Sequence, residues 1–316
     1  MSAVMRNCLS GDQQQPIIAE VPKALLRQDI CGLDAADRLL AVNSYVVYCT
    51  TANKLPHVMQ EIGRLREVAF RAVGEGTGKA LDLDAFDPHY HHLFVWDEAA
   101  NEIVGAYRLA FTHELIARYG VTSLYTHSLF EFDASLFERL GPSLEMGRSF
   151  VHPAWQGHTR ALRLLWAGIV VLLDQHYAVR HLFGPVSVSP KFSEVGKFLI
   201  VTALQLHHMD SELKQFVRPR NAPRKLAHQT DLQSEQQLIE ISAGLADPGL
   251  LSKFLQRIEH GLKLPMLIKH YIELKGRFAG FNVDEAFNGT LDGLVFVRVE
   301  DITPRMRNRL IGPNSG

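Results

Sequence analysis

Residues 143–177 constrain the fold more than any other part of the chain. Residues 143–151 read Ser-Leu-Glu-Met-Gly-Arg-Ser-Phe-Val, an apolar strand pattern that carries two charges, and residues 159–177 have the strongest amphipathic helical spacing in the sequence. A short apolar strand followed by a long apolar helix is typical of the interior of an α/β sheet. A charge in that position is costly unless it is paired or functional, so Glu145 and Arg148 are the first candidates for a site.

The two charges on this strand allow two interpretations. Strict alternation sends Glu145 and Arg148 to opposite faces of the sheet unless a β-bulge intervenes. Either the carboxylate and the guanidinium serve a catalytic site, or they form a buried or edge ion pair that only stabilises the strand. The sequence leaves both interpretations open.

The composition is that of an ordinary soluble globular protein. The chain has 316 residues, of which 47% are hydrophobic and 21% charged, and its formal net charge is -1. This excludes the strong basicity of a nucleic-acid-binding protein and the excess charge of a disordered chain. The three cysteines, Cys8, Cys31 and Cys49, are widely spaced, which argues against a disulfide framework or a zinc site and suits a reducing cytoplasm.

The hydropathy of the chain argues against a membrane-spanning segment. Residues 1–15 contain no apolar core of a secretory signal, and the longest apolar run, Leu164–Leu173, is about half the length that a membrane span needs. We therefore expect a cytoplasmic protein, for which peripheral contact with a membrane stays open.

The residue patterns predict a mixed α/β domain with short terminal segments. We expect an N-terminal arm over 1–40, a main domain over 41–303 with a basic loop and helical insert at about 211–260, and a C-terminal tail over 304–316. The strands at 92–96 and 103–111 should form an antiparallel hairpin. The other expected strands are 44–50, 143–151, 182–188 and 293–299, and the expected helices are 56–70, 114–119, 159–177, 191–207, 231–244, 248–260 and 265–274.

A basic segment stands out on this neutral chain. No acidic residue occurs between Glu212 and Lys225, whereas this stretch contains five basic residues: Lys214, Arg218, Arg220, Arg224 and Lys225. Such a run is most often a solvated loop, but it is also a surface on which an acidic protein could dock.

Several familiar motifs are ruled out by their spacing. The run Gly74–Lys79 is not a phosphate-binding loop, because Val73 and Ala80 stand where such a loop needs Gly and Ser or Thr, so we expect a flexible connector. No G-x-S-x-G motif occurs, and no cysteine lies in an activating context, so covalent catalysis has no support. Asp82, Asp84, Asp87, His89, His91 and His92 match no metal-ligand spacing, so we expect no metal.

The remaining charged residues fall into motifs with a characteristic order. They are Arg71 after Ala69-Phe70, Asp84-x-x-Asp87, Gly105-Ala106-Tyr107-Arg108-Leu109 and Glu145-Met146-Gly147-Arg148, followed by Leu274-Lys275-Gly276-Arg277, Phe281-Asn282-Val283-Asp284 and Leu291-Asp292-Gly293-Leu294. The first four resemble acyl-homoserine-lactone synthases. The whole series, over roughly residues 42–300, resembles more closely the hemolysin-like, ornithine-lipid-synthase type of N-acyltransferase in the GNAT superfamily.

This resemblance implies an α/β (α+β) fold with a mixed, mostly antiparallel central sheet flanked by helices. It also implies an enzyme that moves a fatty acyl group, with or without a 3-hydroxyl, to the amine of an amino acid or a similar small acceptor. Acyl carrier protein is the expected donor and partner, coenzyme A is the other candidate, and no tightly bound cofactor is expected. A lactone-signal synthase using S-adenosylmethionine and a non-catalytic acyl or acyl-carrier binding module remain the alternatives.

The donor is expected to bind at the start of the 159–177 helix. Residues 156–161 read Q-x-x-T-x-A, with Thr159 where coenzyme A-binding members of the superfamily have a glycine. Free N–H groups at a helix N-terminus can still hold one phosphate, which favours acyl carrier protein. The expected donor-binding residues are Phe150, Val151, Gln156, Gly157, His158 and Thr159.

The expected chemistry is attack of a neutral amine on a thioester. Glu145 would take the amine proton, through water, if burial raises its pKa, and a backbone N–H near 149–151 would meet the oxyanion. Arg148 is the second expected catalytic residue. Arg71, Arg108 and Arg148 would orient the carboxylate of the acceptor or hold the acidic pair in place. The expected substrate-binding residues are Arg71, Asp84, Asp87 and Arg108. Apolar residues of 164–173 and Phe183 would line an acyl tunnel or, on pattern alone, form ordinary core.

Overall fold

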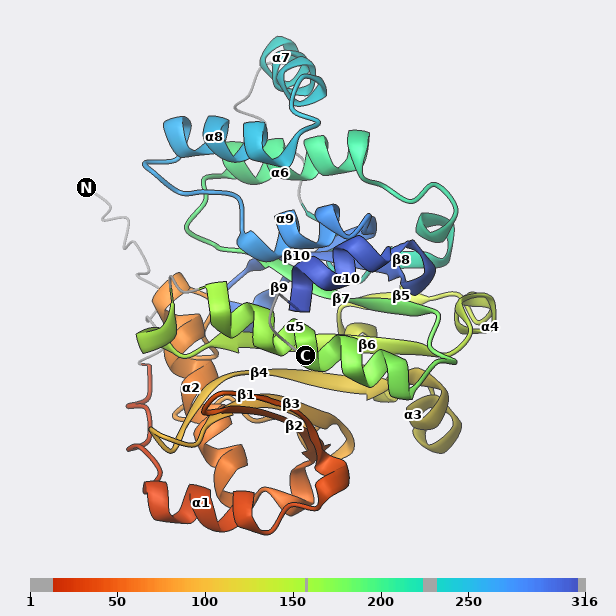
Figure 1. Cartoon of the computed structure of the whole chain (residues 1–316). Coiled ribbons are helices and arrows are strands. Elements are labelled where there is room, and N and C mark those ends of the chain that lie inside the picture. The colour runs from red at the N-terminus through yellow and green to blue at the C-terminus, as the bar shows by residue number, and fades with distance from the viewer. Residues whose placement is uncertain (1–13, 157–158, 224–231, 312–316) are drawn as a thin grey trace, which may run out of the picture.

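The computed structural model describes residues 14–156, 159–223 and 232–311. Its centre is an eight-stranded sheet with the order β1-β2-β3-β4-β6-β7-β10-β9 (Figure 1). All neighbouring strands are antiparallel except β6 and β7, which confirms the expected mixed, mostly antiparallel sheet. The strands are β1 (Arg38–Val42), β2 (Tyr45–Thr51), β3 (His91–Asp97), β4 (Glu102–Phe111), β6 (Ser143–Val151), β7 (His181–Val188), β9 (Arg277–Asp284) and β10 (Thr290–Arg298), with β5 (Phe130–Phe132) and β8 (Val217–Pro219) in a separate pair.

Helices cover both faces of the sheet. One face packs on α5, whose Gly168 approaches β2 so closely that a Cβ there would lie 2.6 Å from Val47 Cγ1. The other face packs on α2 through apolar residues such as Ile62 and Phe94. None of the described helices is long and apolar enough to cross a membrane. The helices are α1 (Lys23–Cys31), α2 (Pro56–Val73), α3 (Thr112–Tyr119), α4 (Leu136–Leu140), α5 (Thr159–Gln175), α6 (Glu194–His207), α7 (Leu232–Ala243), α8 (Pro248–Ile258), α9 (Met266–Glu273) and α10 (Pro304–Ile311).

The terminal segments and the insert take part in the fold. The arm expected to end at residue 40 ends inside β1, which pairs with β2. The tail expected from residue 304 contains α10, which packs on α5 and places Arg307 Nη1 2.5 Å from Asp174 Oδ1. Within the insert, α7 and α8 pack on α6. The sequence patterns missed β1 and β9, two edge strands whose short or glycine-interrupted runs carry little periodicity.

A β-bulge in β6 decides where its charges point. Gly147 pairs with Arg108 and Phe150 with Ala106, so three steps along β6 match two steps along β4. The extra residue is accommodated at Arg148, whose φ of +49° lies in the left-handed region. The bulge brings Arg148 to the face of the sheet on which Glu145 lies, and both side chains reach the segment around Tyr125.

The strands β6 and β7 separate after a short contact. They pair in parallel only from Ser143 with His181 to Glu145 with Phe183. Beyond this point the facing edges of β6 and β7 have no ladder partner among the described residues, while the other edge of β6 pairs with β4 and the other edge of β7 pairs with β10. The sheet therefore opens beside the bulge of β6.

Candidate active site

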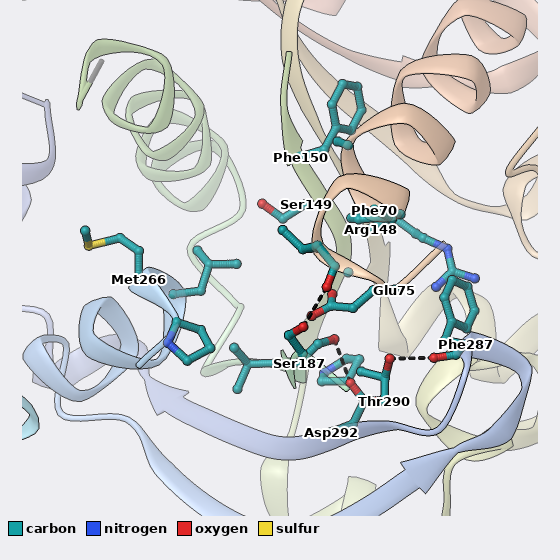
Figure 2. Close-up of a pocket in the computed structure, with 18 of the residues that line it drawn as sticks. Phe70, Glu75, Arg148, Ser149, Phe150, Ser187, Met266, Phe287, Thr290 and Asp292 are labelled. Carbon is teal, nitrogen blue, oxygen red and sulfur yellow. Dashed lines mark hydrogen bonds between the residues drawn. The ribbon is translucent and has the colours of Figure 1, made fainter. Parts of the chain in front are cut away.

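A cavity of about 540 Å³ lies at the opening between β6 and β7 (Figure 2). Its walls are the bulged end of β6, the end of β7, the C-terminal turn of α2 with the loop that follows it, the segment 262–267, and the connection from β9 to β10. Gly147 and Ser149 of β6 line it, and Phe70 and Phe287 contribute aromatic surface. A narrow apolar molecule with polar groups along its length can pass between the two strands here.

A second cavity of about 720 Å³ shares a wall with the first. Its own lining is mostly apolar and comes from the region before α5 and from α5, α9 and α10. The shared wall consists of Ser149, Phe150, Val151, Gln156, Met266 and Leu267. Residues found only in the second cavity include Trp155, Leu162, Trp166, Leu274, Met306 and Leu310.

The predicted acidic pair is held by three arginines. Asp84 Oδ1 lies 2.6 Å from Arg108 Nη1, and Asp84 Oδ2 lies 3.1 Å from Arg148 Nη2. Asp87 Oδ1 lies 2.8 Å from Arg66 Nη1 and 3.4 Å from Arg108 Nη1. Burial acts to raise the pKa of Asp87, but the guanidinium groups of Arg66 and Arg108 outweigh it and hold that pKa well below its usual range. Both aspartates lie outside the linings of the two cavities, so the acidic pair lies behind the wall to which Arg148 belongs.

Arg71 is not part of this cluster, which corrects one expectation from the sequence. Its Nε donates to Glu67 Oε1 at 2.6 Å, and its terminal nitrogens donate to the carbonyls of Gln15 and Lys79. The arginine nearest to Asp87 is Arg66, which the sequence interpretation overlooked. The available signal was helical spacing, since Arg66 lies four residues after the buried Ile62 on the apolar face of α2.

Arg148 joins the cluster to the first cavity. Its guanidinium lies 4.6 Å from the centre of the Tyr125 ring and 4.3 Å from that of Phe287, and it donates to the Tyr125 hydroxyl at 3.1 Å. Stacking between two rings, together with the bond to Asp84, fixes a cation on the cavity wall.

Glu145 lies deep in the sheet and makes no ion pair with Arg148. One carboxylate oxygen accepts a hydrogen bond from the Tyr90 hydroxyl, and the other accepts one from the backbone N–H of Thr126 at 2.7 Å. The residue is 2% exposed, and burial raises its pKa. Glu145 is absent from the linings of both cavities, so its predicted role as the base has no direct route to a substrate in this structure.

The glycine-rich run 74–79 is a tightly bonded loop rather than the flexible connector that we expected. The buried Glu67 carboxylate accepts hydrogen bonds from Thr77 N, Thr77 Oγ1 and Gly78 N at 3.1, 2.6 and 2.9 Å. Gly74 ends α2 with a φ of +87°, and a Cβ on Gly76 would lie 2.4 Å from Arg71 Cγ. The loop places Glu75 on the wall of the first cavity.

Burial raises the pKa of two carboxylates on this wall. Partial burial raises the pKa of Glu75 to about 7. Burial also raises the pKa of Asp292 to about 7, against the stabilising hydrogen bond that Ser187 Oγ donates to Asp292 Oδ1 at 2.7 Å. Neither residue was a predicted site residue, although Asp292 lies in one of the motifs that carry the family resemblance.

The expected donor-binding residues are only partly described. Phe150, Val151 and Gln156 line both cavities. Gly157 and His158 lie outside the described residues, and Thr159 is the first residue of α5.

Most of the residues considered for an acyl tunnel belong to the core. The run 164–173 is buried against the sheet, with only Trp166 from it reaching the second cavity. Phe183 stacks on Phe296, with the ring centres 5.3 Å apart. Within the described ranges no three His, Cys, Asp or Glu side chains come together as a metal site would need.

The sequence of the chain is similar to those of known acyltransferases. Residues 65–167 match the family model of the acetyltransferase (GNAT) domain. The chain is 32% identical over 311 residues to the glycine N(alpha)-acyltransferase of Bacteroides thetaiotaomicron, covering 94% of this chain and 90% of that protein. It is 30% identical to the glycine N(alpha)-acyltransferase of Phocaeicola vulgatus, covering 94% of this chain and 93% of the relative.

A solved structure of a CoA-dependent acyl-homoserine lactone synthase, BjaI, with SAM and isopentyl-CoA is also similar, at 12% identity and a TM-score of 0.41, covering 86% of this chain and 92% of that one. This likeness is too distant to bear on the ligands of the present chain.

Proposed function

The chain belongs to the family of GNAT N-acyltransferases that contains these glycine N(alpha)-acyltransferases, and we propose that it transfers a fatty acyl group from a thioester to the amine of glycine or of a similarly small amino acid. The observation that carries this proposal is the identity, along nearly the whole chain, to two glycine N(alpha)-acyltransferases. The opening between β6 and β7 agrees with it, because it offers a thioester a place between two strand edges.

The donor arm fits the opening through backbone chemistry. A phosphopantetheine arm is narrow and carries two amide groups, so it can lie between β6 and β7 as an added strand does and pair with their free edges. The extra residue of the β6 bulge leaves backbone groups at 148–150 beside the cavity, where an N–H can meet the oxyanion of the tetrahedral intermediate.

We propose acyl carrier protein as the donor. The start of α5 can hold one phosphate on its free N–H groups, and Thr159 stands where pyrophosphate-binding members of the superfamily have a glycine. The apolar second cavity would take the acyl chain, because it shares a wall with the first cavity at Ser149 and Phe150 and is lined by residues such as Trp166 and Leu274.

The acceptor would occupy the first cavity beside Arg148. Lys191 and Lys263 also line this cavity, so a small acceptor finds positive charge for its carboxylate. Arg108 would hold the acidic pair in place rather than bind the acceptor, since it is 1% exposed and lies against Asp84 and Asp87.

The direct test is a reconstituted transfer reaction. The purified protein is mixed with glycine and a hexadecanoyl thioester of either acyl carrier protein or coenzyme A, and N-acylglycine is measured by mass spectrometry. We expect N-acylglycine from both thioesters, with a higher kcat/KM for acyl carrier protein. Ser187→Phe, which fills the first cavity, should abolish the reaction in a protein that still folds.

Three outcomes would overturn the proposal or its parts. A lactone formed from S-adenosylmethionine would favour the synthase alternative, and binding of the acyl carrier without turnover on any amino acid would favour a non-catalytic module. Equal kcat/KM for the two thioesters would remove the argument for acyl carrier protein as the donor.

A further inference from the structure

Glu75 has a carboxylate that faces the first cavity without a partner. Its backbone N–H donates to the carbonyl of Phe70 at 2.8 Å, directly after the left-handed Gly74 that ends α2. Within the described part of the chain, its side chain makes neither a hydrogen bond nor an ion pair. Figure 2 shows Glu75 in the same part of the cavity as Ser187 and Asp292. A carboxylate in this setting keeps its lone pairs free for a ligand.

The loop that carries Glu75 is held from three sides. From α2, the helix that precedes the loop, the Glu67 carboxylate accepts hydrogen bonds from the N–H groups of Thr77 and Gly78. From the end of β7, Ser189 Oγ donates to the Val73 carbonyl at 2.6 Å and Lys191 Nζ to the Ala72 carbonyl at 2.7 Å. From the β9–β10 connection, Asn288 Nδ2 donates to the Gly74 carbonyl at 3.2 Å. These bonds hold the backbone on both sides of Glu75, whose side chain has no bond among the described residues.

The charges around Glu75 come from every wall of the cavity. Two of them are carboxylates, Asp292 on β10 and Asp284 on β9, and a second negative charge near Glu75 makes full ionisation of the group costly. The cations that line the same cavity are Arg148 on β6, Lys191 after β7 and Lys263 before α9. The cavity can therefore hold a zwitterion whose ammonium lies toward the carboxylates and whose carboxylate lies toward the cations.

We propose that Glu75 is the catalytic proton acceptor for the acceptor amine. The inference rests on the proposed function and deepens it. Glu75 takes one proton from the ammonium, and the freed nitrogen lone pair forms the C–N bond at the thioester carbonyl. The carbonyl electron pair moves to oxygen and returns as the C–S bond breaks. The nitrogen then loses a second proton, which neutralises the leaving thiolate, and the proton on Glu75 passes to solvent.

Glu75 suits this role better than Glu145 does. Both oxygens of Glu145 already accept hydrogen bonds, and the residue lies behind the cavity wall. The pKa of Glu75, raised to about 7 by partial burial, also matches a base that must be ionised at neutral pH and still hold a proton well.

The test compares Glu75→Gln with the wild type in single turnovers at saturating glycine. The wild-type rate should rise with pH through an apparent pKa near 7. Glu75→Gln should be slower by roughly 10²- to 10⁴-fold and should lose this inflection, while its affinity for the acyl thioester stays within about threefold. Glu194→Gln, an exposed carboxylate on α6, serves as the matched control and should behave as the wild type does.

A second variant guards against a trivial loss of folding. Glu75→Ala leaves space on the cavity wall, and formate should restore part of its activity without affecting the wild type. If the wild type makes N-acylglycine but Glu75→Gln keeps more than a tenth of the rate with its inflection intact, this inference is wrong and the proposed function stands. If the wild type acylates no amine, the proposed function falls and this inference falls with it.

Discussion

Arg66 Nη1 lies 2.8 Å from Asp87 Oδ1, and both side chains are buried. Arg66→Met removes the nearer of two guanidinium groups that face Asp87 and leaves this buried carboxylate with Arg108 at 3.4 Å, so the free energy of unfolding should fall by at most about 3 to 5 kcal/mol. Urea unfolding at pH 7 measures this, with Arg27→Met on the exposed surface of α1 as the control.

The pH dependence of this loss has a defined sign. The pKa of Asp87 is lower in the folded state than in the unfolded chain, where an aspartate has a pKa of about 4. The contribution of Asp87 to the free energy of unfolding is therefore fully present above about pH 4 and is lost as the pH falls below it. The difference in free energy of unfolding between Arg66→Met and the wild type should therefore shrink below about pH 4. A constant difference down to pH 2.5 would contradict the ion pair as its source.

Glu145→Gln distinguishes a role of Glu145 in folding stability from a role as the catalytic base. The Glu145 carboxylate accepts from two donors, and an amide offers only one oxygen, so one buried donor is left without a partner. We expect a loss of about 1 to 3 kcal/mol in the free energy of unfolding and less than a tenfold fall in kcat. Paired measurements of melting and turnover decide the point. A fall of roughly 10²- to 10⁴-fold in kcat with unchanged stability would instead make Glu145 the base, as the sequence alone suggests.

Asp292→Asn should stabilise the protein at alkaline pH. The folded-state pKa of Asp292 is raised to about 7, so the stability it contributes at low pH is lost as the pH rises from about 4 through 7. Replacing the carboxylate by an amide removes that loss. At pH 8 the free energy of unfolding of Asp292→Asn should exceed that of the wild type by no more than roughly 4 kcal/mol. At pH 4 the two free energies should be nearly equal. Thermal melts at the two pH values test this, and a variant that is less stable at pH 8 would contradict it.

The basic segment should act in donor docking. Arg218 is exposed on β8, and Arg220 lies 3.2 Å from Glu131, while Arg224 and Lys225 lie outside the described residues. Acyl carrier proteins are acidic, so Arg218→Glu with Arg220→Glu should raise KM for the acyl carrier thioester several-fold at low salt and less at high salt. Kinetics at two ionic strengths, with Arg257→Glu on α8 as a control, measure the effect. An unchanged KM at low salt would remove this segment from the docking surface.

Local patterns in the sequence were sufficient for the main elements. The helices at 56–70 and 159–177, the hairpin of β3 and β4 and the strand carrying Glu145 follow from apolar spacing, which depends only on near neighbours in the chain. The order of the charged motifs likewise led to the acyltransferase family, which the identity to two glycine N(alpha)-acyltransferases supports. Both kinds of signal are carried by residue type and spacing alone.

Only the tertiary structure decided which charges meet. Arg66 and Arg71 have the same chemistry and lie five residues apart on one helix. Asp87 nevertheless pairs with Arg66, whereas Arg71 pairs with Glu67 on the helix and donates to the Lys79 carbonyl in the loop that follows. Whether Arg148 shares a face with Glu145 depends on a single bulged residue. Glu75 reaches the cavity because Glu67, Ser189 and Asn288, distant from one another in sequence, bind one short loop. Such contacts depend on long-range packing and on the exclusion of water, and spacing along the chain records neither.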